Sequence, residues 1–168
     1  MEGKRAVPVI ASCLLVVGVA ALAEVPANPG FEKLKTLIGQ WESATPNGNH
    51  GMVRYELVSD GSAILERMSG DAHAMDMVTV YHRDGKRLVM THYCSAGNQP
   101  RMRAEPAAGD VKQLDFRFLD VTNLASPDAG HMHELVVSFE DANHFTQEWH
   151  WLDHGKESVE AFHFVRKQ

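Results

Sequence analysis

Cysteine is almost absent from this sequence, because its 168 residues include only Cys13 and Cys94. Cys13 lies in an N-terminal apolar segment that we expect to be removed, so the mature chain has one thiol and no internal disulfide. About 145 residues can bury most of the apolar surface of one domain without such crosslinks. In an oxidising compartment, Cys94 is then expected to be buried, bound to a metal, modified or paired with a second chain.

Motifs of fixed spacing are also missing. The sequence contains no Cys-x-x-Cys, no His-Glu-x-x-His, no calcium-binding loop and no Gly-x-Ser-x-Gly nucleophile turn. A nucleophile and base made of Cys94 and His92 would be strained along one strand, although His131 or His133 could reach Cys94 across a sheet. We therefore predict no catalytic residue, and the sequence favours a protein that is not an enzyme.

Long uncharged runs are missing except at the N-terminus. Residues 6–23 carry no charge, follow Lys4 and Arg5, and end in Ala21-Leu22-Ala23. This combination is typical of a secretory signal peptide that is cleaved after Ala23. We therefore expect a secreted or periplasmic protein with a signal peptide at residues 1–23.

Two other interpretations of this segment are open. A transmembrane anchor needs an apolar run of roughly 18–20 residues, which this run only just reaches, and the run contains Pro8. Lipidation is the second, because Ile10-Ala11-Ser12-Cys13 resembles a bacterial lipobox. The apolar run continues past Cys13, whereas lipoproteins usually become polar there. After cleavage we expect no membrane span.

Basic residues are in deficit. Without the first 23 residues, 14 Lys and Arg face 21 Asp and Glu, a formal net charge of −7. A nucleic acid or an anionic membrane surface would require a basic stripe, so the charge argues against both partners. The sequence leaves the oligomeric state open.

The mature chain begins with a linker at residues 24–30 and a short helical pattern. Phe31, Leu34, Leu37 and Ile38 share one face of a helix that starts near Pro29 and stops at Gly39. This helix is a candidate lid or plug for the domain at residues 31–168.

Ten short segments follow in which apolar and polar residues alternate, as in β-strands. Turn residues such as Asp60-Gly61 and Asp84-Gly85 separate them. Successive hairpins without helices between them form an antiparallel up-and-down meander, and a sheet of this length tends to close. We therefore predict an all-β fold, a closed barrel of about ten strands with a short N-terminal helix. The predicted strands are 40–43, 52–58, 63–69, 75–82, 86–94, 100–105, 111–119, 132–140, 145–152 and 158–166.

The order of a short helix, Gly39-Gln40-Trp41, ten strands and a terminal Arg166 resembles the calycin group of lipocalins and fatty-acid-binding proteins. Over the whole mature chain it is similar to the DUF1579-type family of secreted bacterial proteins of unknown function. The resemblance implies a barrel with an interior cavity, and a Trp41 that packs against Arg166 across the closed end of the barrel. It implies no activity.

The segment 88–103 contains more side chains that can bind a ligand or take part in a reaction than any other segment. Met90, His92 and Cys94 share one face of a predicted strand, and their thioether, imidazole and thiol groups suit a ligand pocket or a soft metal. They are also compatible with an ordinary core or surface face.

Two more histidines, His131 and His133, alternate on a later strand and are expected to project the same way, as metal ligands often do. The predicted metal ligands are His92, Cys94, His131 and His133. Haem is a further alternative, because nitrobindin-like calycins hold it through a histidine of a late strand, a position that His163 matches. The glycine-rich signature that we would expect after Trp41 is absent.

Arg101 and Arg103 share a strand face, and if they point inward they would bind a carboxylate or phosphate group. If they point outward they would pair with surface carboxylates, which avoids two uncompensated buried charges. Trp149 and Trp151 alternate with polar residues and could form the walls of a pocket or the ordinary core.

Three functions follow from these patterns. The first is binding of a small, largely apolar molecule inside the barrel, with Met90, His92, Cys94, Arg101, Arg103, Trp149 and Trp151 as the predicted ligand-binding residues. The second is binding of a metal or haem through the histidines and Cys94. The third is a structural or interaction role in the cell envelope, with Cys94 in an intermolecular disulfide.

Overall fold

The computed structural model describes residues 27–44, 50–70 and 76–168. The predicted signal peptide and both alternatives to it lie outside these residues. The described chain forms one short helix and ten strands, which confirms the predicted fold class. The elements are α1 (Pro29–Lys35), β1 (Gly39–Ala44), β2 (His50–Val58), β3 (Ala63–Gly70), β4 (Met77–Asp84), β5 (Arg87–Tyr93), β6 (Gln99–Ala104), β7 (Gln113–Thr122), β8 (His131–Phe139), β9 (His144–Asp153) and β10 (Lys156–Arg166).

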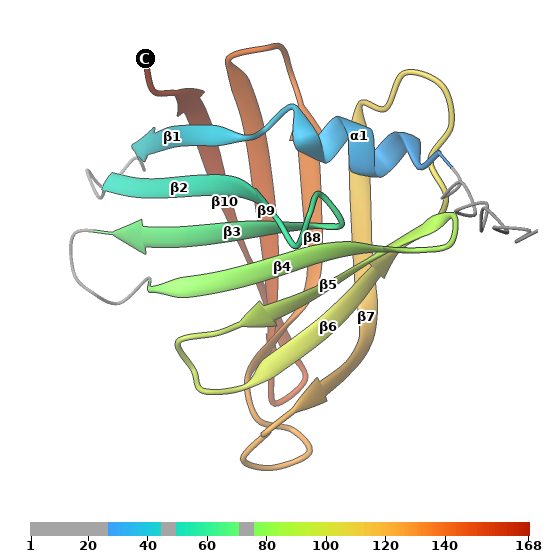
Figure 1. The fold of residues 1–168 in the computed structure, drawn as a ribbon. Helices are drawn as coiled ribbons and strands as arrows, with labels where there is room; N and C mark the ends of the chain where they lie inside the picture. Colours follow the sequence, from blue (N-terminus) through green and yellow to red (C-terminus); the bar gives the residue numbers. More distant parts are fainter. Residues whose placement is uncertain (1–26, 45–49, 71–75) are drawn as a thin grey trace, which may run out of the picture.

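The ten strands form one closed barrel in which every strand pairs antiparallel with its neighbours in sequence (Figure 1). Closure occurs between β1 and β10, where Trp41 lies opposite Arg166. A closed barrel leaves no unpaired edge, which explains why a meander of this length does not remain an open sheet. None of the helices in the described ranges is long and apolar enough to cross a membrane.

The alternation of buried and exposed side chains along each strand determines which residues fill the barrel. On β3, for example, Ile64, Glu66 and Met68 are buried while Arg67 and Ser69 are exposed. The same period brings Tyr81, Phe116 and Leu135 into a continuous apolar core. Most of the barrel is therefore a packed interior, and a binding site inside the barrel must use the space that this core leaves open.

Helix α1 lies across one end of the barrel (Figure 1). Asn28 caps it by accepting a hydrogen bond from the Phe31 amide, and its side chain also donates to the carbonyl of Arg87 at 3.1 Å. Phe31 and Leu34 are buried against the core, so α1 acts as a plug. The helix begins at Pro29, where the ring fixes a helical φ.

Trp41 and Arg166 complete the plug, as the resemblance to calycins implied. The Arg166 guanidinium lies 4.0 Å from the centre of the Trp41 ring, and it donates to the carbonyls of Thr36 and Ile38. The Trp41 indole donates to the carbonyl of Leu37 at 2.7 Å. These contacts tie the end of α1 to both strands that close the barrel.

Candidate functional site

A cavity of about 210 Å³ lies at the end of the barrel opposite α1. The β5–β6 turn contributes Cys94, Ser95 and Ala96 to its wall. The rest of the wall is mainly apolar and is formed by Met68, Met77, Met132, Trp149, Trp151 and Phe162, together with Glu160. Three thioethers and three aromatic rings in this wall surround one buried polar group.

That polar group is the imidazole of His92, which is only 1% exposed. Its Nδ1 lies 2.9 Å from the Thr79 hydroxyl, and its ring lies 4.6 Å from the Trp149 ring. Its Nε2 is fully buried and has no hydrogen-bond partner among the described residues. An unpaired buried nitrogen costs roughly 1–3 kcal/mol, so His92 lacks one hydrogen bond at a residue that lines the cavity.

Burial lowers the pKa of His92 to about 4. The imidazole is therefore neutral at pH 7, and one ring nitrogen carries the proton. With Nδ1 next to Thr79, Nε2 is left as either a donor or an acceptor, depending on the tautomer. A hydroxyl group, which can donate or accept, is complementary to Nε2 in either tautomer.

A layer of hydrogen-bonded polar side chains lies deeper in the barrel. The Tyr81 hydroxyl donates to Glu66 Oε2 at 2.5 Å, and the Gln147 amide donates to Glu66 Oε1 at 3.0 Å and to the Tyr55 hydroxyl at 2.7 Å. Burial raises the pKa of the Glu66 carboxyl. Trp149 joins this layer to the cavity, because its indole donates to Gln147 Oε1 at 3.1 Å.

Four of the predicted ligand-binding residues line this cavity. His92 and Cys94 come from β5 and the turn after it, and Trp149 and Trp151 come from β9. Met90 is fully buried on the same face of β5 but belongs to the packed core. The face that carries Met90, His92 and Cys94 therefore points inward.

Arg101 and Arg103 do not reach the cavity. Met102 between them is fully buried. Because successive side chains of a strand point to opposite faces, both arginines lie on the outer surface. Arg101 forms a two-point ion pair with Asp120, and Arg103 pairs with Glu105 at 3.1 Å. The interpretation in which they hold an anionic group inside the barrel does not fit these contacts.

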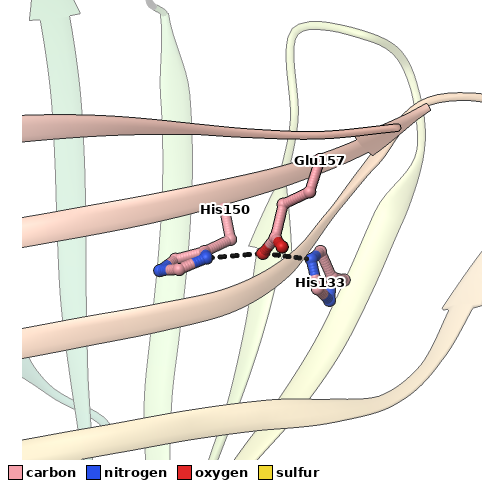
Figure 2. Close-up of side chains that lie close together, drawn as sticks. All are labelled: His133, His150 and Glu157. Carbon is pink, nitrogen blue, oxygen red and sulfur yellow. Dashed lines mark hydrogen bonds and ion pairs between the residues drawn. The ribbon is translucent and has the colours of Figure 1, made fainter. Parts of the chain in front are cut away.

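The histidines of β8 do not join His92 and Cys94 either. The pairing of β8 with β9 shifts between Met132 and Glu134 and leaves His133 unpaired, so His131 and His133 do not share a regular face. His131 is buried, with its Nδ1 2.9 Å from the Ala129 carbonyl oxygen. His133 meets His150 and Glu157 on the outside of the barrel (Figure 2).

His163, the position considered for a haem ligand, also lies outside. It is exposed between the buried Phe162 and Phe164, and its Nδ1 lies 2.9 Å from the Thr146 hydroxyl. A late-strand histidine on this face cannot reach a group inside the barrel.

Several functional residues were not identified from the sequence. Glu66 gave a usable signal, because a carboxylate between Ile64 and Met68 on an otherwise apolar face indicates a buried polar cluster. Thr79 and Gln147 gave no such signal, since neutral polar residues alternate on many exposed strand faces. The glycine at position 130 was also missed.

Gly130 leaves room for Trp151 at the mouth of the cavity. A Cβ atom at this position would lie 2.2 Å from Cζ2 of the Trp151 ring, far inside van der Waals contact. Only glycine lets the β7–β8 connection approach the ring so closely.

Comparison with models of known protein families and a search of curated proteins each found no match. The geometry of the cavity therefore carries the functional argument.

Proposed function

We propose that this lipocalin-like barrel binds a small, largely apolar molecule that carries one hydrogen-bonding group. The observation that supports this proposal is the buried His92, which lines a mainly apolar cavity and whose Nε2 has no hydrogen-bond partner among the described residues. A ligand that satisfies this nitrogen would remove an existing cost while its apolar part is buried against thioethers and aromatic rings.

The size of the cavity limits the ligand. Pockets for drug-sized molecules measure roughly 300–1,000 Å³, and this cavity measures about 210 Å³. A compact molecule such as a substituted phenol suits it better than a fatty acid or haem. A more open depression of about 570 Å³ adjoins the cavity and shares Trp149, Trp151 and Glu160 with it.

The proposal predicts a specific preference for a hydroxyl group. The purified protein should bind p-cresol about tenfold more tightly than toluene, because the two molecules share a ring and a methyl group and differ in one hydrogen bond. In His92→Leu this preference should disappear. Isothermal titration calorimetry measures both affinities.

His163→Leu is the matched control, because His163 also contacts a threonine hydroxyl at 2.9 Å but lies on the outer surface. It should keep the tenfold preference. Absence of saturable binding for both molecules would contradict the proposal, as would an unchanged preference in His92→Leu.

A soft metal ion is the second candidate occupant, since Cys94, His92 and the thioethers of Met68, Met77 and Met132 line the same cavity. Thiolate and thioether ligands select Cu(I). Competition with a Cu(I) chelator under anaerobic conditions distinguishes the two candidates. Cys94→Ser should lose Cu(I) while keeping p-cresol binding if the site holds metal.

The location and the third function remain proposals. Residues 1–23 support secretion or a periplasmic location by their pattern alone, and fractionation of the native host tests it. A disulfide between chains through Cys94 is the less favoured alternative, because Cys94 is only partly exposed and lines the cavity. Non-reducing electrophoresis that shows a dimer would support it.

A further inference from the structure

Three side chains from three neighbouring strands meet on the outer wall of the barrel (Figure 2). His133 comes from β8, His150 from β9 and Glu157 from β10. Glu157 Oε1 lies 3.1 Å from His133 Nε2 and 2.7 Å from His150 Nδ1. One ligand atom from each residue lies within 4.8 Å of the other two. In the part of the chain that the structure describes, this is the one such group of three.

The backbone explains how the three residues come together. The register shift in β8 leaves His133 without a partner in β9, because Met132 pairs with Trp151 and Glu134 pairs with His150. Such irregularities redirect a side chain. On the other side of β9, Glu157 lies opposite Leu152, one diagonal step from His150 on the same face.

We propose that His133, His150 and Glu157 form a binding site for a divalent transition-metal ion, with Zn²⁺ as the expected occupant. Two imidazole nitrogens and one carboxylate oxygen are a common set of three protein ligands for zinc, which leaves a fourth position for water. Ligand atoms around tetrahedral zinc lie roughly 3.3 Å apart, as follows from metal–ligand distances of about 2.0–2.2 Å. Both distances to Glu157 are within about 0.6 Å of this spacing.

The surroundings suit a partly hydrated cation. The side chains of His133, His150 and Glu157 are 24%, 18% and 47% exposed, so an ion can enter and keep a water ligand. The ligand set contains nitrogen and oxygen but no sulfur, which favours Zn²⁺ and its first-row neighbours over Cu(I). The net negative charge of the chain also attracts cations.

The ordinary alternative is a surface hydrogen-bonded cluster in which Glu157 accepts from two imidazoles. Such exposed pairs contribute roughly 0–1 kcal/mol, so stability measurements alone would not separate the two interpretations. A titration with the metal alone does.

Isothermal titration calorimetry with Zn²⁺ on the chelator-treated protein should show one ion per chain. His133→Ala, His150→Ala and Glu157→Gln should each weaken binding at least about tenfold, because losing a direct ligand should cost at least as much as losing a group that only orients one. Glu157→Gln keeps the size and the hydrogen-bonding shape of the side chain, and circular dichroism confirms that each variant folds. Co²⁺ in place of Zn²⁺ allows a second measurement, because Co²⁺ in a tetrahedral site should absorb visible light.

His144→Ala is the matched control. His144 contacts Asp141 at 2.9 Å on the surface, much as His133 contacts Glu157, but no second histidine is part of that contact. It should bind Zn²⁺ as the unmodified protein does, and because none of these variants changes a residue of the cavity, this proposal can fail independently of the cavity. Unchanged affinity in all three ligand variants, absence of Zn²⁺ binding in the unmodified protein, or equal loss in His144→Ala would overturn it.

Discussion

Replacing Trp41 by alanine should lower the free energy of unfolding by about 4 kcal/mol. The ring is almost fully buried, packs edge-on against Phe145 at 4.7 Å, and carries the Arg166 guanidinium on its face. Its removal leaves a cavity and also frees the cation that ties α1 to β10. Domains have total stabilities of roughly 5–15 kcal/mol, so this one change removes a large share. Urea unfolding followed by circular dichroism measures it.

Trp151→Ala provides the comparison, because the same residue type is only partly buried at the open end. We expect it to lower stability by about 1 kcal/mol, since little apolar area leaves the core. Equal effects of the two variants would show that the closed end is not where the barrel is held together.

The fold class could be predicted because it depends on local signals, whereas the sequence left open which face of each strand points inward. Period-two alternation determines which side of a strand is apolar, and turn residues such as Gly85, with φ of +59°, set where the strands end. The same reasoning placed His92 and Cys94 together and left open which way Arg101 and Arg103 point. The buried Met102 between those arginines settles their direction.

The parts that were missed depend on pairing between strands. His133 and His131 appear equivalent in the sequence, and only the register shift against β9 separates them. Glu157 of β10 meets His133 of β8 across the intervening strand β9. No local sequence pattern encodes this arrangement. The polar layer around Glu66 likewise depends on Gln147, a residue 81 positions away.

Acidification should destabilise the protein through His92 by about 3 kcal/mol between pH 7 and pH 4. Burial holds the pKa of the folded-state imidazole at about 4, below its ordinary 6.5. As the pH falls through this window, His92 becomes protonated in the unfolded chain but stays neutral in the folded chain. The free energy of unfolding therefore decreases. His92→Leu should lack this loss, which urea unfolding at a series of pH values measures as a difference from the unmodified protein.

Glu66 should act in the opposite direction from the same interior. Burial raises the pKa of its carboxyl above the ordinary 4.5, so the folded chain takes up this proton first and gains stability as the pH falls towards 4.5. Glu66→Gln should therefore lose stability more steeply on acidification than the unmodified protein, while His92→Leu loses it less steeply. The difference between each variant's curve and the curve of the unmodified protein removes the contribution of surface carboxylates. If both interior variants shifted the curve in the same direction, the two groups would not be buried as the structure places them. If the directions are as expected, His92 is buried as a neutral imidazole at near-neutral pH.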